Sequence, residues 1–230
     1  MQLISSVFLP MLAGHLVADF WMQPASWVRQ KKSNGWKSGK LLVHSVIGAI
    51  LPVLFTFQIE LWWFVPIIFA THFLIDAVKL RFKDSVATFL IDQMLHILVL
   101  FVLAFFVTQA TIPERHIVFW IYAAGFVLLT NPAGIFTGMF LSVVIPGKNK
   151  KSKHDISAWI GVLERILILI FILADQFTAI GFLIAAKSIF RFNDTREDGN
   201  VKAEYFLLGT LVSFTLAVVV GLAIQYLTVL

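Results

Sequence analysis

The chain has 230 residues, of which 59% are hydrophobic and 13% charged, and its mean hydropathy is +0.89. This much apolar surface excludes an ordinary soluble globular domain, and the absence of cysteine excludes disulfides and thiolate metal sites. The formal net charge of +5 is spread over short connections between apolar runs. It therefore indicates membrane topology and not a nucleic-acid partner.

Long apolar runs follow one another from end to end of the chain, over residues 3–22, 41–57, 61–80, 86–108, 116–145, 156–174, 178–189 and 205–230. A helix needs about 20 apolar residues to cross about 30 Å of hydrocarbon. The run 178–189 is short, and it spans only if Lys187 and Arg191 extend their charged ends to the interface. We therefore expect an all-α, polytopic transmembrane helical bundle of about eight helices that forms a single integral membrane domain over residues 1–230.

Sixteen of the 18 basic residues lie in or beside alternate connections between these runs. Because basic residues prefer cytoplasmic loops, the alternation predicts that both termini are periplasmic. The segment 24–40 carries five basic residues, two tryptophans and no acidic residue. We expect it to be an interfacial loop that contacts anionic lipid head groups of the bilayer.

The run 116–145 would extend about 45 Å as one helix. Asn131, Pro132 and Gly134 lie near its middle and predict a kink or a break, because proline removes a helical hydrogen bond. A re-entrant pair of helices is the alternative. It would place the basic string KNKKSKH outside the cytoplasm, against the charge rule.

Three pairs of ionisable residues lie four positions apart inside apolar runs: His15 and Asp19, His72 and Asp76, and Asp92 and His96. Residues at i and i+4 share one helix face. A histidine beside a carboxylate is either a metal ligand with its orienting partner or a proton-handling pair. Ionisable groups are costly inside a membrane, so they usually face an interior functional site.

Depth along each run supports one shared site. At 1.5 Å per residue, the first set of ionisable residues lies about 5–10 Å from the cytoplasmic end and the second set about 12–16 Å. The first set is Asp19, His44, Asp76 and Asp92, and the second is His15, His72, His96 and Glu164. Helices of opposite direction thus carry these groups in the same half of the bilayer, and the pattern predicts one polar cavity open to the cytoplasm.

Imidazole and carboxylate donors suit zinc, iron or manganese. We expect a divalent metal, with zinc preferred and iron or manganese as alternatives, bound by His15, His72, Asp76, Asp92 and His96. Asp19 and Glu164 are candidates for the catalytic general base or for orienting the ligands. The alternative is that these groups only join helices through hydrogen bonds.

A second group of candidates could contact the substrate or an anionic group: His44, Lys187 and Arg191. Lys187 and Arg191 lie one helical turn apart and could bind a phosphate near the membrane surface. Extension of both side chains to the interface explains them equally well.

The strings GHLVADFWMQ, HFLIDAVK and FLIDQMLH, followed by GVLERILI and AAKSIFRF, resemble a bacterial integral-membrane family of unknown function. The resemblance covers most of the chain and implies a multi-pass protein of the bacterial cytoplasmic membrane, without implying an activity. HFLID, residues 72–76, is also similar to the HxxxD-like settings of membrane-bound metal-dependent hydrolases. The HxxxH motif of intramembrane zinc hydrolases and the EExxxR motif of CAAX-type proteases are missing.

These observations predict a metal-dependent membrane enzyme, a hydrolase that acts on a lipid or amphiphile from the cytoplasmic leaflet. A proton- or metal-coupled transporter is the alternative, because chains of His and Asp also form proton relays. The sequence shows no inverted repeat, and polar groups are sparse in the outer halves of the runs, which disfavours transport. A haem held by two histidines and a purely structural membrane protein are further alternatives.

Overall fold

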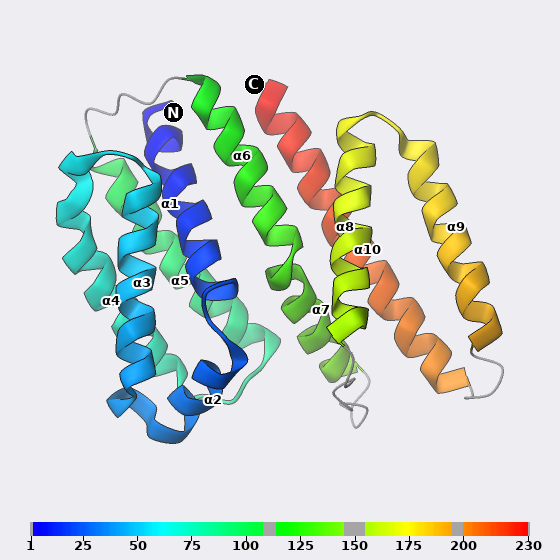
Figure 1. Ribbon diagram of the computed structural model, residues 1–230, viewed down its shortest axis with the longest axis horizontal. Helices are drawn as coiled ribbons and strands as arrows, with labels where there is room; N and C mark the ends of the chain where they lie inside the picture. The colour runs from blue at the N-terminus through cyan, green and yellow to red at the C-terminus, as the bar shows by residue number, and fades with distance from the viewer. Residues whose placement is uncertain (1, 108–113, 145–154, 195–199, 230) are drawn as a thin grey trace. The chain divides into compact units, whose positions relative to one another are not determined.

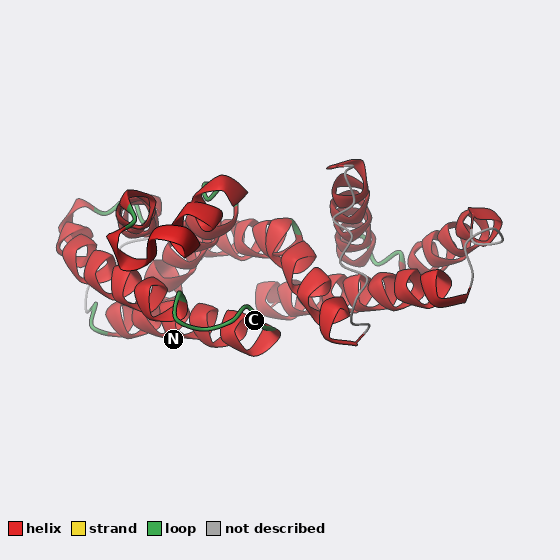
Figure 2. Ribbon diagram, turned by 90° about the horizontal axis from the view of Figure 1, so that it is seen from below, coloured by secondary structure: helices red, strands yellow, loops and turns green. Residues whose placement is uncertain are grey.

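The computed structural model describes residues 2–107, 114–144, 155–194 and 200–229 of the chain. All regular structure in these segments is helical, without a strand (Figures 1 and 2). Each predicted apolar run contains a helix, which confirms the all-α class. The basic connection between the fifth and sixth runs lies outside the described residues.

The chain groups into two compact units, Met1–Val127 and Leu128–Leu230. The expectation of a single integral membrane domain stays a prediction. The first unit contains α1 (Gln2–Phe20), α2 (Ala25–Asn34), η1 (Gly35–Lys37), α3 (Gly39–Phe55), η2 (Ile59–Trp63), α4 (Phe64–Lys79), α5 (Val86–Phe105) and most of α6 (Glu114–Leu129).

Helices α1, α3, α4 and α5 form a closed four-helix arrangement in the first unit. Each packs against the next in this order, and α5 packs back against α1. Successive helices run in opposite directions (Figure 1). The C-terminal halves of α1 and α4 therefore lie at the same end of the bundle as the N-terminal halves of α3 and α5.

Two glycines allow the close helix contacts of this bundle. A Cβ atom on Gly14 would lie 2.7 Å from the carbonyl oxygen of Leu51, so α1 and α3 cross with their backbones in contact. A Cβ atom on Gly48 would lie 2.7 Å from Cε1 of His72. Because real Cβ atoms do not approach so closely, Gly48 leaves the space in which the His72 ring fits against α3.

The start of α5 is set by a capping box. The Thr88 backbone N–H donates to the Ser85 hydroxyl at 3.1 Å, and the Ser85 backbone N–H donates to the Thr88 hydroxyl at 2.9 Å. Reciprocal caps of this kind satisfy backbone donors that the first turn of a helix leaves without partners. The cap begins α5 at Val86 and so places Asp92 in its first half and His96 at its middle.

The two ends of the bundle differ in character. One end carries an apolar core formed by Val7, Met11, Ala49, Val53, Leu61, Phe64, Ile68, Leu100, Leu103, Ala104 and Val107. The other end carries the buried histidines and aspartates. Among the residues of the first unit whose burial is described, no buried ionisable side chain lies at the apolar end.

Helix α2 lies across the polar end of the bundle (Figure 1). The segment Ala25–Lys37 meets α3 at an angle of 105°. The sequence predicts an interfacial loop here, but most of the segment is helical. Its contact with anionic lipids stays a prediction. Lys31 is buried on its inward face, whereas Trp36 in η1 is 65% exposed.

The second unit contains the end of α6 with α7 (Asn131–Val144), α8 (Asp155–Leu173), α9 (Phe177–Asp194) and α10 (Asn200–Val229). Helix α6 ends at Leu129 and α7 begins at Asn131, which is the break predicted from Pro132. The buried guanidinium of Arg165 donates to the carbonyl oxygens of Leu129 at 2.5 Å and Thr130 at 2.8 Å. It also donates to the hydroxyl of Ser213 in α10 at 3.1 Å. Arg165 therefore supplies side-chain donors to two carbonyl groups at the break between α6 and α7.

Four described segments are long and apolar enough to cross a membrane: Ile59–Lys79, Val86–Phe105, His116–Val144 and Glu204–Val229. The bent pair α2–α3 raises this number to five if it counts as one span. Ser6–Phe20 and Phe177–Ile189 are shorter apolar helices. The count of eight spans and the periplasmic termini stay predictions.

Candidate functional site

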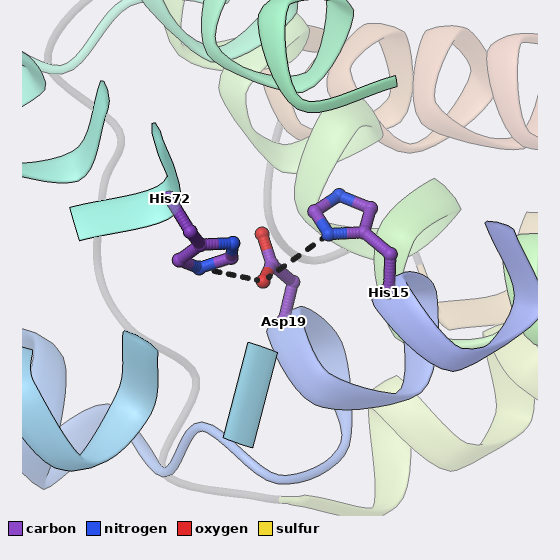
Figure 3. Close-up of side chains that lie close together, drawn as sticks. All are labelled: His15, Asp19 and His72. Carbon is purple, nitrogen blue, oxygen red and sulfur yellow. Dashed lines mark ion pairs between the residues drawn. The ribbon is translucent and has the colours of Figure 1, made fainter. Parts of the chain in front are cut away.

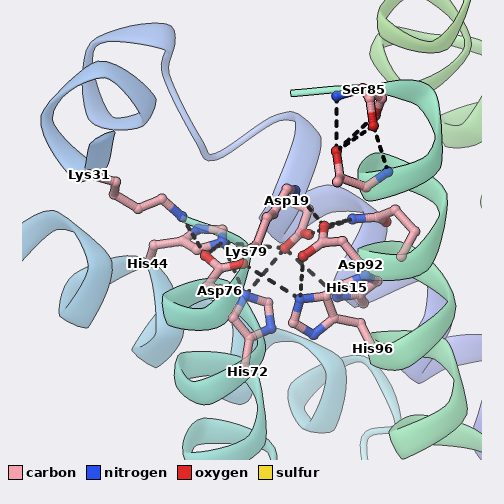
Figure 4. A network of polar contacts seen from close by, with 12 residues as sticks. His15, Asp19, Lys31, His44, His72, Asp76, Lys79, Ser85, Asp92 and His96 are labelled. Atoms are coloured by element: carbon pink, nitrogen blue, oxygen red, sulfur yellow. Dashed lines mark hydrogen bonds and ion pairs between the residues drawn. The ribbon is translucent and has the colours of Figure 1, made fainter. Parts of the chain in front are cut away.

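Histidines and aspartates from all four bundle helices meet at the polar end of the first unit (Figure 4). Each helix contributes one histidine, and three of them contribute an aspartate: His15 and Asp19 from α1, His44 from α3, His72 and Asp76 from α4, and Asp92 and His96 from α5. We call these residues the His/Asp cluster. All except Asp19 are at most 5% exposed, and the Asp19 side chain is 9% exposed.

Asp19 lies between three imidazole rings. Its Oδ1 atom is 3.4 Å from Nε2 of His44, 3.5 Å from Nε2 of His72 and 3.8 Å from Nδ1 of His15. Figure 3 shows the carboxylate of Asp19 between His15 and His72. One carboxylate oxygen therefore faces nitrogen atoms from three different helices.

Asp76 lies between His44 and His96. Its Oδ2 atom is 3.6 Å from Nε2 of His44, and its Oδ1 atom is 3.6 Å from Nε2 of His96. The Nε2 atom of His96 is also 3.6 Å from Oδ1 of Asp92. The rings of His72 and His96 are stacked at a tilt, with centroids 4.1 Å apart, so the cluster is continuous.

Two lysines and one glutamine complete the polar contacts. Lys31 of α2 reaches Oδ2 of Asp76 at 2.5 Å, and Lys79 at the end of α4 reaches Oδ2 of Asp92 at 2.5 Å. The Gln93 amide donates to Oδ2 of Asp19 at 3.1 Å and to Oδ2 of Asp92 at 3.2 Å. Asp76 and Asp92 therefore each have an ammonium partner, whereas the carboxylate of Asp19 lies beside imidazoles and an amide.

Several buried atoms of the His/Asp cluster have no hydrogen-bond partner among the described residues: His15 Nε2, Asp19 Oδ1, His44 Nδ1, Asp92 Oδ1 and His96 Nε2. A buried polar group without a partner costs about 1–3 kcal/mol. Packing alone does not account for so many of these groups in one place. The arrangement is instead typical of a site whose donors and acceptors are used by something that binds there.

The separations between imidazole and carboxylate atoms fit a shared metal ion. Hydrogen bonds to oxygen are about 2.7–3.2 Å long, so pairs at 3.4–3.8 Å are too far apart to be hydrogen-bonded. Two ligands held at ~2.0–2.2 Å by one tetrahedral ion lie about 3.3–3.6 Å from each other. The imidazole–carboxylate distances are therefore closer to those between ligands of one ion than to those of direct hydrogen bonds. The Nε2 atoms of His44 and His72, in contrast, lie 3.0 Å apart, which is hydrogen-bond distance.

Three sets of donors have ligand atoms within 4.8 Å of one another and could hold a metal ion: His15, Asp19 and His72; His44, His72 and Asp76; and Asp19, Asp92 and His96. Neutral imidazoles and carboxylates are the donors that zinc, iron and manganese accept. The residues present thus fit a divalent metal in number, type and spacing.

The structure brings together His44 and all three His/Asp pairs that lie four positions apart in the sequence. Glu164 and Lys187 are paired with each other in the second unit, and the Lys187 ammonium also lies over the Phe214 ring. The predicted roles of these two residues in catalysis and anion binding stay predictions. Arg191 belongs to α9, but its side chain lies outside the described residues.

Sequence reasoning missed four contributors to the site: Lys31, Lys79, Gln93 and Gly48. Lys79 follows Asp76 by three positions, so helical periodicity predicts that it shares a face with Asp76. Gln93 is a polar residue within an apolar run, which is a local signal of the same kind as the histidines and aspartates. Gly48 follows His44 by four positions on the inward face of α3. Lys31 gives no local signal, because its contact depends on the sharp bend between α2 and α3.

Comparisons with known proteins give a family but no activity. No curated protein and no solved structure matches the chain. The similarity to membrane-bound metal-dependent hydrolases therefore stays a prediction. One family matches residues 7–123, which is just over half of the chain and contains the whole His/Asp cluster with Lys31, Lys79 and Gln93. The chain thus belongs to DUF3307, a family described as proteins of unknown function.

Proposed function

We propose that the first unit is the metal centre of an integral membrane hydrolase, with the His/Asp cluster as its ligand set. The observation that carries this proposal is the spacing of imidazole and carboxylate atoms at 3.4–3.8 Å around buried atoms that lack hydrogen-bond partners. Zinc suits these donors best, because the distances match tetrahedral ligands. Iron and manganese are the alternatives.

The bound metal would lower the pKa of a water molecule toward neutrality and polarise the bond to be cleaved. The chain's own residues would bind the metal and orient the ligands. Gln93 holds the carboxylates of Asp19 and Asp92 together, as expected of a partner that orients ligands. Asp19 and Glu164 stay the candidates for the general base, and Asp19 is the one within the cluster.

The substrate class follows from the surroundings of the site. The side chain of Lys79 is 35% exposed, and the exposed Lys32 pairs with Asp84, so lysine side chains lie at the rim of the polar end of the bundle. The opposite end is filled by the apolar core. A lipid or amphiphile with a polar head group would therefore reach the centre from the basic side, which the charge rule assigns to the cytoplasm.

A proton- or metal-coupled transporter is the second candidate, and the two lysine–carboxylate pairs favour it. A bound cation could exchange with these ammonium groups as it passes. The apolar core at the opposite end of the same helices argues against it, because a transport path needs polar groups or water on both sides.

Metal analysis of the purified protein tests the proposal. Protein isolated in detergent is expected to carry zinc, iron or manganese in stoichiometric amount, and to hydrolyse chromogenic acyl-ester or phosphodiester amphiphiles. Removal of the metal with a chelator should abolish this hydrolysis, and the same metal should restore it. Metal-free protein that is folded and inactive would contradict the proposal. Cation flux into proteoliposomes without product formation would favour the transporter.

Cysteine labelling tests the orientation of the site, and the chain has no native cysteine to interfere. A cysteine at Ser33 in α2 should be labelled only from the cytoplasmic side by an impermeant reagent. A cysteine at Phe57, an 83% exposed residue that follows α3, should be labelled only from the periplasmic side. Labelling of the Ser33 variant from outside would reverse the assignment.

A further inference from the structure

Two of the three donor sets of the His/Asp cluster share no residue. One set consists of His44, His72 and Asp76 from α3 and α4, and the other of Asp19, Asp92 and His96 from α1 and α5. We call them the α3/α4 half and the α1/α5 half. Each has three donors, which is the number of protein ligands that a catalytic zinc usually has. His15 is an additional donor whose Nε2 atom has no hydrogen-bond partner in the part of the chain that the structure describes.

Each half has its own lysine. The ammonium of Lys31 lies 2.5 Å from Asp76 in the α3/α4 half, and that of Lys79 lies 2.5 Å from Asp92 in the α1/α5 half. In both cases the lysine contacts the Oδ2 atom of the carboxylate, whereas the Oδ1 atom faces His96. The two halves therefore repeat one arrangement, in which a positive charge is already held at a ligand carboxylate.

Two carboxylates connect the halves. Asp19 belongs to the α1/α5 half, but its Oδ1 atom is 3.4 Å and 3.5 Å from His44 and His72 of the other half. Asp76 belongs to the α3/α4 half, but its Oδ1 atom is 3.6 Å from His96 of the other half. Carboxylates that reach two sets of donors are suited to bridge a pair of ions about 3.5–4 Å apart.

We propose that the cluster binds two divalent ions, one in each half, and that each ion displaces a lysine ammonium from its carboxylate. This inference rests on the proposed metal centre. It adds the number of ions that bind there and the role of the two lysines, whose ammonium groups neutralise the carboxylates before a metal binds. In it Asp19 acts as a bridging ligand and not as the general base. The lysines stay protonated and move to the rim of the site, where they can meet an anionic head group of the substrate.

The balance of charge requires this exchange. The three carboxylates of the cluster outnumber the two ammonium groups by one. Two divalent ions added beside both lysines would leave a large excess of positive charge in a buried site, which is unfavourable at low dielectric. Departure of the lysines removes most of this excess. Lys79 is 35% exposed in its side chain and can leave directly, whereas the buried Lys31 can leave only with a movement of α2.

Manganese binding to full-length protein in detergent tests the proposal. After removal of metals with a chelator, wild-type protein is expected to bind two Mn²⁺ ions per chain, with the electron paramagnetic resonance spectrum of an exchange-coupled pair. His44→Ala should bind one ion in the α1/α5 half, and His96→Ala one ion in the α3/α4 half. Both variants should show the spectrum of an isolated ion.

The lysine variants test the exchange. Lys31→Met and Lys79→Met should each bind one of the two ions more tightly, by about 5- to 150-fold, which is the usual range of coupling between two ligands. Lys32→Met is the matched control, because Lys32 is the neighbouring residue of α2 and pairs with the exposed Asp84. Its manganese affinity should equal that of the wild type. If Lys31→Met fails to fold, the more exposed Lys79 gives the same test.

Each result is decisive. One ion per chain in the wild type would overturn the two-ion inference and leave the proposed metal centre intact. Protein that binds no manganese, zinc or iron would overturn both. Two ions without exchange coupling would show that no carboxylate bridges them. Two ions with unchanged affinity in both lysine variants would overturn the exchange.

Discussion

Both units bury charged side chains among apolar helices, but they satisfy these charges differently. In the second unit the buried guanidinium of Arg165 donates to two carbonyl oxygens and a hydroxyl. In the first unit five buried atoms of the His/Asp cluster have no hydrogen-bond partner within the described segments. A buried charge alone is therefore a poor indicator of function. Hydrogen-bonding capacity that the fold does not use is a better one, because its cost must be offset by something that binds.

Mutations in the two units should therefore have different effects, one on stability and the other on metal binding. If Arg165 is structural, its loss should lower stability and leave metal binding unchanged. If the His/Asp cluster is a metal centre, loss of a ligand should lower metal binding most. The following variants test these two expectations.

The largest effect is expected from His72→Ala. His72 belongs to two of the three donor sets, so its loss removes a ligand from each of them. Metal affinity should fall by more than the about 10- to 100-fold that loss of a supporting residue costs, and hydrolysis should be lost with it. Metal content and turnover are measured on protein whose fold is checked by circular dichroism. A variant that keeps its full metal content would remove His72 from the ligand set.

Gly48→Ala should have a smaller effect at the same site. The new Cβ atom would lie 2.7 Å from the His72 ring and force it to shift. We expect metal affinity to fall by about 10- to 100-fold, as for other disturbed supports of a ligand. Gly39→Ala is the matched control in α3, because a Cβ atom there meets no neighbour within 4 Å. Equal metal affinity in the two variants would show that the position of the His72 ring does not matter.

Arg165→Met should act on stability alone. It removes the donors to the carbonyls of Leu129 and Thr130 at the break between α6 and α7. Loss of these partners should lower the free energy of unfolding by about 1–3 kcal/mol, measured by denaturation in mixed micelles. Its metal content should match that of the wild type. A loss of metal from this variant would end the separation of the two units into a structural and a functional one.

Ser213→Ala sharpens the same test with the smallest change. It removes one of the three acceptors of Arg165, so the expected loss is about 0.5–1.5 kcal/mol. Thr215→Ala is a control on the same helix, because its hydroxyl bonds to Leu211 within α10. If both variants are equally stable, the contact between Arg165 and α10 contributes nothing measurable.

Much of the His/Asp cluster follows from the sequence alone. The spacing of four positions puts His15 with Asp19 and His72 with Asp76 on one helix face, and the rise per residue puts all three pairs at the same depth. Both quantities are local properties of a helix, so they hold whatever the helices pack against. The break at Pro132 is local for the same reason.

Contacts between helices were decided only by the tertiary structure. Lys31 pairs with Asp76 because α2 turns by 105° across the end of the bundle, and no periodicity in the sequence encodes that angle. Glu164 has the same predicted depth as the histidines, yet its partner is Lys187 in the second unit. Depth along a helix is set by the sequence, but the direction in which a side chain points depends on how the helix rotates and tilts against its neighbours. That rotation is set by packing contacts such as those at Gly14 and Gly48.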